Sequence, residues 1–202
     1  MKCNSLAGLA ALAMLAAAAS GACAAGANDQ FAKRMFVENF APQGKSYACF
    51  VRRYDAAHLA RHRLQKVSVM KLLITAEITP EDNALNYSFR LGLNFRDRPG
   101  DFDSSGGCSQ PTASQVSASK MELGCDIDCD AAGISIELAH ADKSTLLHLD
   151  SIRIWHDNKP EEEGLDLSGG ADDRVFRLDR AKLDECSALV ADRKELAAMR
   201  HK

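Results

Sequence analysis

Four acidic residues in the middle of the chain have the spacing of a calcium-binding loop. Asp126, Asp128 and Asp130 alternate with other residues, and Glu137 follows seven positions after Asp130. EF-hand loops supply carboxylates at the corresponding first, third, fifth and twelfth positions, because a hard cation prefers several oxygen ligands. The sixth position is Ala131, where that loop needs glycine, and the flanking residues predict strands. Calcium binding at the tip of a β-hairpin is therefore an alternative function, and no other cofactor is predicted.

A second polar group is the run Arg52, Arg53, Tyr54 and Asp55, which comes at the end of a predicted strand. Two guanidinium groups, a phenol and a carboxylate could line a site for a ligand or a partner. The same groups could instead form ion pairs that protect the margin of a sheet. The second interpretation is the simpler one, and the sequence leaves both open.

Motifs typical of catalysis are absent from the sequence. It contains no Gly-x-Ser-x-Gly, no Ser-x-x-Lys and no phosphate-binding glycine loop. His58 and His62 have the spacing of a metal-binding pair on a helix, but no glutamate follows His58 as a zinc-protease motif requires. The sequence therefore predicts a protein that is not an enzyme and names no catalytic residue, with a secreted hydrolase of unrecognised type as an alternative.

Residues 1–24 have the layout of a secretory signal peptide. Lys2 precedes an apolar run over residues 6–19, and Ala22-Cys23-Ala24 is a small-x-small cleavage site. Ala25-Gly26-Ala27 is a second possible cleavage site. Small residues precede Cys23 but the leucine typical of lipoproteins is missing, so we expect no lipid anchor. No later segment is apolar enough to span a membrane. The destination is predicted as the periplasm or the medium.

The cysteines of the mature chain are expected to pair in an oxidising compartment. Five remain after the leader: Cys49, Cys108, Cys125, Cys129 and Cys186. Cys125 and Cys129 fall on one predicted strand, where four residues cover about 13 Å. A disulfide needs Cα atoms within about 7 Å, so these two cannot bond to each other. We predict two disulfides and one free thiol, with Cys108–Cys125 as the first choice and Cys129–Cys186 tethering the C-terminal helix.

The bulk composition is that of one globular domain. Removing 24 of the 202 residues leaves 178, and residues 25–202 are predicted to form a single disulfide-stabilised β-rich domain. The net charge of -3 indicates no nucleic-acid partner. Basic residues gather in the first third of the mature chain and acidic residues in the middle, a distribution typical of a solvated surface with internal ion pairs.

Alternation of apolar and polar residues predicts a mainly β fold. It is strictest from Leu85 to Phe95, where six large side chains fall on one face. That run should pair with the alternating run from Val67 to Ile78 as a long hairpin. Other expected elements are a helix over 28–40, strands over 47–55, 120–130, 134–138 and 175–178, one strand or a bent pair of strands over 146–156, a helical turn over 55–63, a loop over 98–119, a connection over 165–173 and a helix capped by Asp179. About seven strands with short helices at both ends favour an antiparallel β-sandwich or barrel.

These expectations combine into an exported, non-enzymatic domain that binds a protein or small-molecule partner in the cell envelope. The interior of the fold should separate the two kinds of partner. A deep apolar pocket would favour a ligand carrier, whereas an interior filled by side chains would favour protein contacts.

Overall fold

Strands dominate the computed structural model, which describes residues 30–37, 40–41, 44–79, 84–109, 116–117, 120–127, 133–156, 159 and 163–201. The predicted signal peptide with Cys23, and Cys129, Asp128 and Asp130, lie outside the described residues. The strands in the described part are β1 (Lys45–Arg53), β2 (Val67–Ile78), β3 (Leu85–Phe95), β4 (Phe102–Cys108), β5 (Val116–Ser117), β6 (Lys120–Asp126), β7 (Gly133–Ala139), β8 (Ser144–Leu149), β9 (Ser151–His156), β10 (Leu165–Ser168) and β11 (Val175–Ala181). The helical elements are residues 30–36, α2 (Ala56–Arg61), η2 (Leu183–Leu189) and α3 (Arg193–Arg200).

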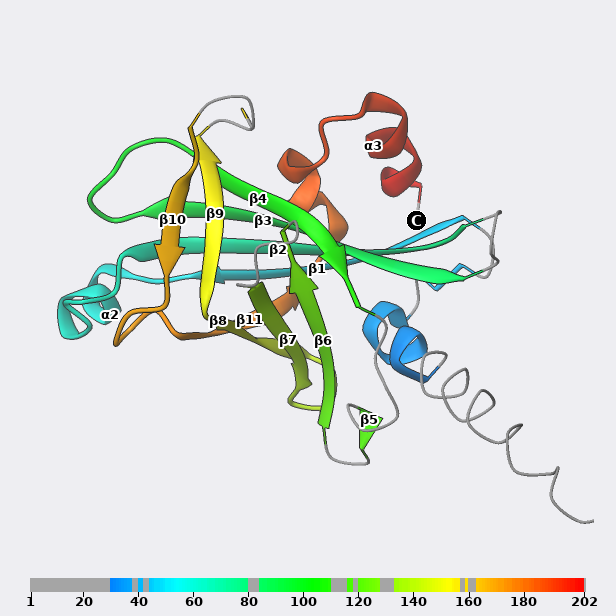
Figure 1. Ribbon diagram of the computed structural model, residues 1–202, viewed down its shortest axis with the longest axis horizontal. Coiled ribbons are helices and arrows are strands. Elements are labelled where there is room, and N and C mark those ends of the chain that lie inside the picture. Colours follow the sequence, from blue (N-terminus) through cyan, green and yellow to red (C-terminus); the bar gives the residue numbers. More distant parts are fainter. Residues whose placement is uncertain are drawn as a thin grey trace, which may run out of the picture.

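Eight of these strands close into an antiparallel barrel, which confirms the predicted fold class (Figure 1). The order around the ring is β4-β3-β2-β1-β11-β8-β7-β6, and β6 returns to β4. The seam is short, because only Gly107 with Asp126 and Cys108 with Cys125 are paired across it. The other half of β4 pairs with β9, and the β9–β10 hairpin therefore extends the sheet beyond the barrel.

The alternation along the long hairpin places large side chains inside the barrel. Tyr87, Phe89, Leu91 and Leu93 of β3 are all buried in the main core, as predicted. Val67 departs from the alternation predicted for the run from Val67 to Ile78. The pairing register shifts between Val67 and Val69, so Val67 turns inward and is fully buried. A β-bulge of this kind reverses the alternation locally.

Three of the expected assignments are wrong: two segments predicted as loops contain strands, and one predicted helix cap lies in a strand. The expected loop over 98–119 contains β4, and the expected connection over 165–173 contains β10. Phe102 is the one large apolar side chain of β4. Burial of side chains therefore contributes little to this strand, and its pairing with β3, β6 and β9 holds it in place. Asp179 lies within β11 and caps no helix. The helical region divides into η2 and α3, and Asp192 caps α3 by accepting from the backbone N–H of Glu195 at 2.7 Å.

The helix over residues 30–36 closes one end of the barrel. Phe31, Met35 and Phe36 are buried, and the rings of both phenylalanines pack against Tyr87, with centroids at 5.6 and 6.3 Å. Arg180 donates hydrogen bonds to the carbonyl oxygens of Met35, Arg34 and Asp142. The Arg34 guanidinium also binds both carboxylate oxygens of Asp142, at 2.6 and 2.9 Å. This end is therefore closed by buried aromatic packing and by a network of arginine hydrogen bonds.

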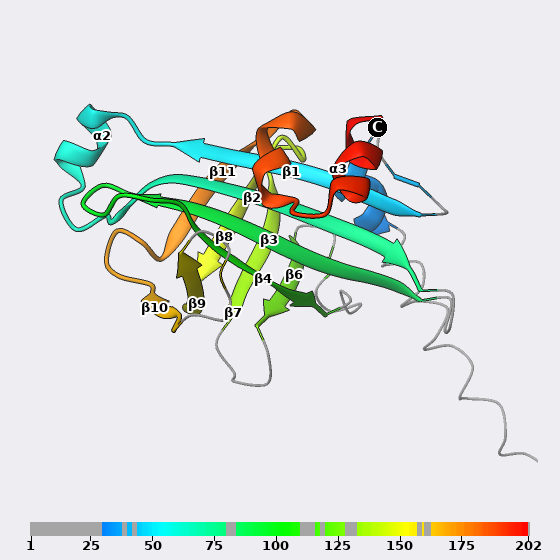
Figure 2. The same cartoon turned by 90° about the horizontal axis from the view of Figure 1, so that it is seen from above.

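A second, smaller core lies outside the barrel, under the C-terminal segment. Figure 2 shows η2 and α3 lying over the outer side of β1, β2 and β3. The outward side chains of Tyr47, Cys49 and Leu73 pack there against Cys186 and Met199. Burying this apolar stripe is what fixes the two short helices on the sheet.

Two disulfides are present among the described residues. Cys108 bonds to Cys125 across the seam of the barrel, which confirms that prediction. Cys186 bonds to Cys49, so the predicted Cys129–Cys186 pairing is wrong. Cys49 points outward from β1, and the chain brings η2 back over it after 137 residues. Within the same part of the chain, none of the helices is long and apolar enough to cross a membrane.

Candidate functional site

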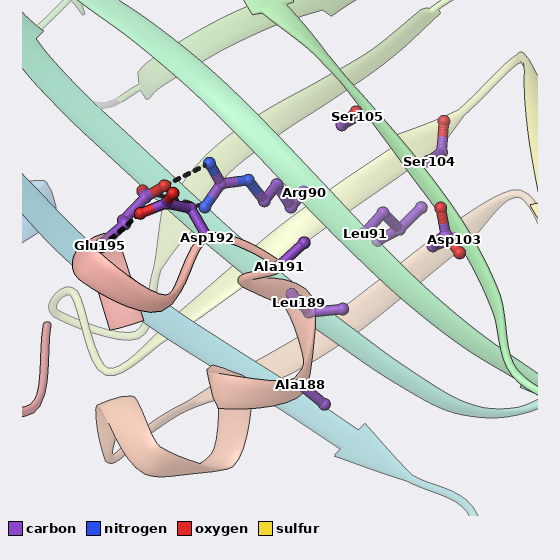
Figure 3. A pocket seen from close by; sticks show the side chains of 10 residues that line it. All are labelled: Arg90, Leu91, Asp103, Ser104, Ser105, Ala188, Leu189, Ala191, Asp192 and Glu195. Carbon is purple, nitrogen blue, oxygen red and sulfur yellow. Dashed lines mark hydrogen bonds and ion pairs between the residues drawn. The ribbon is translucent and has the colours of Figure 1, made fainter. Parts of the chain in front are cut away.

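A groove runs along the outer face of β3 and β4 beside the C-terminal helices. It consists of two adjoining cavities of about 290 and 380 Å³, which share Asp103, Ala188 and Leu189. Figure 3 shows the side chains that line the smaller of the two. The sheet forms its floor, and the end of η2 with the start of α3 forms one wall. The groove lies on the opposite face of β3 from the barrel core.

Residues with short side chains, or with none, line the floor of this groove. Gly92 is the outward residue at its centre, and a Cβ atom placed there would lie 2.6 Å from Cδ2 of Leu189. The missing side chain lets Leu189 rest on the strand between the two cavities. Ser105, Ala188 and Ala191 also line the groove, so much of its surface is backbone and short side chains.

An ion pair between β3 and α3 closes one end of the groove. Arg90 donates to both carboxylate oxygens of Glu195, at 3.0 and 2.9 Å, and Lys45 Nζ lies 3.6 Å from the same carboxylate. Burial alone would raise the pKa of Glu195, but the hydrogen bonds and charge of Arg90, with the charge of Lys45, outweigh it and lower this pKa. Burial, and then the charge of Glu195, raises the pKa of Tyr47 to about 12. The network keeps Glu195 ionised and Tyr47 neutral, and it joins the helix to the barrel.

The remaining charges of the groove are mostly negative. Apart from the Arg90–Glu195 pair, its lining contains the carboxylates of Asp101, Asp103 and Asp192 and one ammonium group, that of Lys71. Asp101 accepts a hydrogen bond from the Asn94 amide at 2.7 Å, which holds it on the wall. An excess of carboxylates in a groove attracts cations.

The predicted cluster at the end of β1 makes its contacts within the chain. Arg53 binds Glu185 at 2.6 Å. Arg52 lies 3.6 Å from Asp179 and stacks over Tyr54. Asp55 accepts from the backbone N–H of His58 and so caps α2, as predicted. These contacts favour the ion-paired interpretation, and a ligand site at Arg52, Arg53, Tyr54 and Asp55 stays a prediction.

The acidic residues of the calcium pattern are separated in the part of the hairpin that the structure describes. Asp126 pairs with Gly133 at the tip of the β6–β7 hairpin, whereas Glu137 lies four residues further along β7. That separation is about 13 Å along a strand, too far for the two carboxylates to share one ion. Asp128 and Asp130 lie outside the described residues. Calcium binding at the tip therefore stays a prediction, without Glu137.

Two further groups of polar side chains serve local structure. Ser144 Oγ lies 2.9 Å from Nδ1 of His140, but Ser144 is buried and its oxygen is also within hydrogen-bond reach of the Ala139 carbonyl. This serine–histidine contact stabilises the turn between β7 and β8 and gives the serine no access to a substrate. The ring of His58 on α2 stacks at 4.3 Å on that of His62, the C-cap residue, a contact between rings rather than an arrangement around an ion.

The groove itself was not foreseen from the sequence. The one local sign of it is Gly92, a glycine at an outward position of an otherwise regular alternating strand. Comparisons with models of known protein families, with curated proteins and with solved structures give no match. Function is therefore inferred from the geometry of the chain alone.

Proposed function

We propose that this chain is an exported, non-enzymatic binding protein, and that a protein partner binds it in the groove outside β3 and β4. The observation that carries the proposal is the contrast between the two faces of the barrel wall. The inner face is packed with side chains, whereas the outer face carries a groove of two connected cavities.

The filled interior argues against a ligand carrier. Large side chains that are fully buried occupy the barrel: Phe31, Phe36, Phe50, Phe89, Phe176, Met35, Met70, Leu72, Ile74 and Leu91. Barrels that carry small ligands keep this space open, and eight strands leave an interior that side chains alone can fill. The barrel thus acts as a rigid support for surface contacts.

The groove suits an extended basic segment of another protein. Its extent over two adjoining cavities matches an extended chain more than a compact small molecule, and the short side chains of Ser105, Ala188 and Ala191 line it. The carboxylates of Asp101, Asp103 and Asp192 outnumber the single ammonium of Lys71. Lysine or arginine side chains on the partner would find complementary charge there.

Export is supported by the disulfides as well as by the leader pattern. Cys49–Cys186 and Cys108–Cys125 are compatible with an oxidising compartment outside the cytoplasm. The same chemistry applies in the periplasm and in the medium.

The proposal is tested with short fluorescein-labelled peptides in which lysine alternates with small residues, and with the same peptides carrying glutamate for lysine. Fluorescence anisotropy should show saturable binding of the basic peptide only. The double variant Asp101→Asn/Asp103→Asn should weaken binding roughly tenfold, which corresponds to about 1.4 kcal/mol.

The matched control is Asp150→Asn/Asp184→Asn, which removes the same charge at exposed positions outside the groove. Equal affinity for the basic and acidic peptides, or an equal loss in both double variants, would show that the groove does not select the partner.

A further inference from the structure

The barrel has a second concave site, at the end opposite to the helix over residues 30–36. That helix packs on Tyr87, near the start of β3, while Phe95 lies at the end of the same strand. Eight residues of a strand cover about 26 Å. Phe95 lines a pocket of about 240 Å³ with Ile154 of β9 and Leu165 and Leu167 of β10. We call this pocket, with Lys66, Asp97, Arg98 and Asp166 at its rim, the mouth pocket.

The floor of the mouth pocket is apolar and partly open to water. Phe95 packs edge-on against Phe102, and Ile154 and Leu167 belong to the main core. Leu165 is 42% exposed, although its position pairs with Ile154 and shares the inward face of the hairpin. An exposed leucine beside buried apolar residues indicates a surface that an apolar group can cover.

The rim of the mouth pocket carries two cations, and neither forms an ion pair within 4 Å among the described residues. The two acidic residues of the rim form ion pairs with arginines outside the pocket lining. Asp97 pairs with Arg96 at 3.6 Å, and Asp166 pairs with Arg153 at 3.3 Å. Arg98 lies over the rings of Phe95 and Phe102 but forms no ion pair in this part of the chain.

Lys66 is the second of these cations. Its backbone N–H donates to the buried carboxylate of Asp173 at 2.7 Å, its positive charge acts to lower the pKa of that carboxyl, and its exposed side chain lies at the rim. Two cations beside an apolar floor are complementary to a molecule with one apolar and one anionic end.

We propose that the mouth pocket binds a small amphipathic carboxylate. The apolar part lies on Phe95, Leu165 and Leu167, and the carboxylate faces Arg98 and Lys66. A small ligand is expected because 240 Å³ is below the roughly 300–1,000 Å³ of pockets that enclose drug-sized molecules. The pocket lies on the inner side of β3 and the groove on the outer side, so this inference does not depend on the proposed protein partner.

The experiment is a titration of the full mature protein with octanoate, followed by methyl NMR of its leucine and isoleucine residues. Octanol and octylammonium serve as the uncharged and cationic counterparts. We expect saturable shifts of the methyl groups of Leu165, Leu167 and Ile154 with octanoate. Octanol should bind about tenfold more weakly, because the hydrogen bonds to a charged group are lost.

Variants assign the two ends of the ligand. Arg98→Gln and Lys66→Gln should each weaken octanoate binding severalfold while octanol binding is unchanged. Leu165→Ser should weaken both ligands. Arg63→Gln, which removes an exposed cation outside the pocket, is the control, and circular dichroism checks that every variant is folded.

Three outcomes would overturn the proposal. Octanoate and octanol could bind equally well, the affinity for octanoate could be unchanged in Arg98→Gln and Lys66→Gln, or the shifts could spread over residues outside the mouth pocket. Failure of this titration would leave the basic-peptide measurement unaffected, since that site lies on the other face of the sheet.

Discussion

The two ends of the barrel use arginine in opposite ways. At the closed end, Arg180 donates to three carbonyl oxygens and its guanidinium lies 4.6 Å from the ring of Phe50. Arg34 at the same end is bound by Asp142. At the open end, Arg98 lies over the rings of Phe95 and Phe102, and it forms no ion pair with any residue that the structure describes. An arginine whose three nitrogens all donate to backbone carbonyls holds structure together, whereas one without such partners has donors left for a ligand.

The apolar groups differ in the same sense. Phe31 and Phe36 close one end with fully buried rings, while Leu165 at the other end remains partly in water. The comparison separates stability from binding. Substitutions at the closed end should change the free energy of unfolding, and substitutions at the open end should change the affinity for ligands.

The largest effect is expected from the helix that closes the barrel. Phe31→Ala should lower the free energy of unfolding by about 3–5 kcal/mol, because it removes a fully buried ring and leaves a cavity in its place. Leu165→Ala should change it by less than about 0.5 kcal/mol, as expected for a partly exposed side chain. Urea unfolding monitored by circular dichroism measures both. Similar losses in the two variants would contradict the division between the ends.

The arginines provide the second comparison. Arg180→Met should lower the free energy of unfolding by about 1–3 kcal/mol, since partly buried carbonyl oxygens lose their donor. Arg98→Met, the same change at the open end, should stay within about 0.5 kcal/mol. Thermal unfolding of the two variants at equal concentration measures both effects. A loss of stability in Arg98→Met larger than that in Arg180→Met would show that Arg98 is structural.

A third prediction concerns the loop between β3 and β4. Gly100 has a φ of +100°, and a Cβ atom there would lie 2.1 Å from Nε2 of His156. Gly100→Ala should therefore lower the free energy of unfolding by about 1–2 kcal/mol. It should also displace Asp97, Arg98 and Asp101 and so weaken ligand binding at the open end. Gly107→Ala, where nothing lies within 4 Å of the new methyl group, should be close to neutral. Parallel unfolding and binding measurements on both variants check this.

The smallest effect is a pH dependence near the open end. Asp173 is fully buried, and burial raises its pKa despite backbone hydrogen bonds from Lys66 and Val67. A carboxyl group with a raised pKa contributes its full stability below its unfolded value of about 3.9, and that contribution declines as the pH rises through the folded pKa. Asp173→Asn should therefore flatten this decline in urea midpoints measured from acidic to neutral pH. An unchanged pH profile would contradict the assignment.

Elements with strong local periodicity could be predicted, and those that depend on distant partners could not. The twelve-residue β2 and the eleven-residue β3 follow from alternation alone, apart from the register shift at Val67. β4 could not be recognised because Ser105 and its glycine neighbours have no apolar pattern, and its three strand neighbours supply its hydrogen bonds. The bond from Cys49 to Cys186 depends on an outward side chain being covered by the returning chain end.

The candidate sites were less accessible to sequence reasoning than the fold. The groove exists because Leu189 rests on Gly92, and nothing near either residue indicates that they meet. The acidic pattern from Asp126 to Glu137 was prominent in the sequence, yet the hairpin separates its two ends. Spacing along a chain predicts proximity on a helix or at a turn, but strand pairing can carry regularly spaced residues apart.

The position of β11 between β1 and β8 also determines when this barrel can form. A ribosome releases β1 before the other strands, but its second neighbour, β11, and the cysteine that bonds to Cys49 emerge only near the end of the chain. Until then β1 and β8 each expose an unpaired edge, which is a template for aggregation. Premature termination before Val175 would leave that edge open permanently, so quality control of truncated chains should matter more for this topology than for a simple meander.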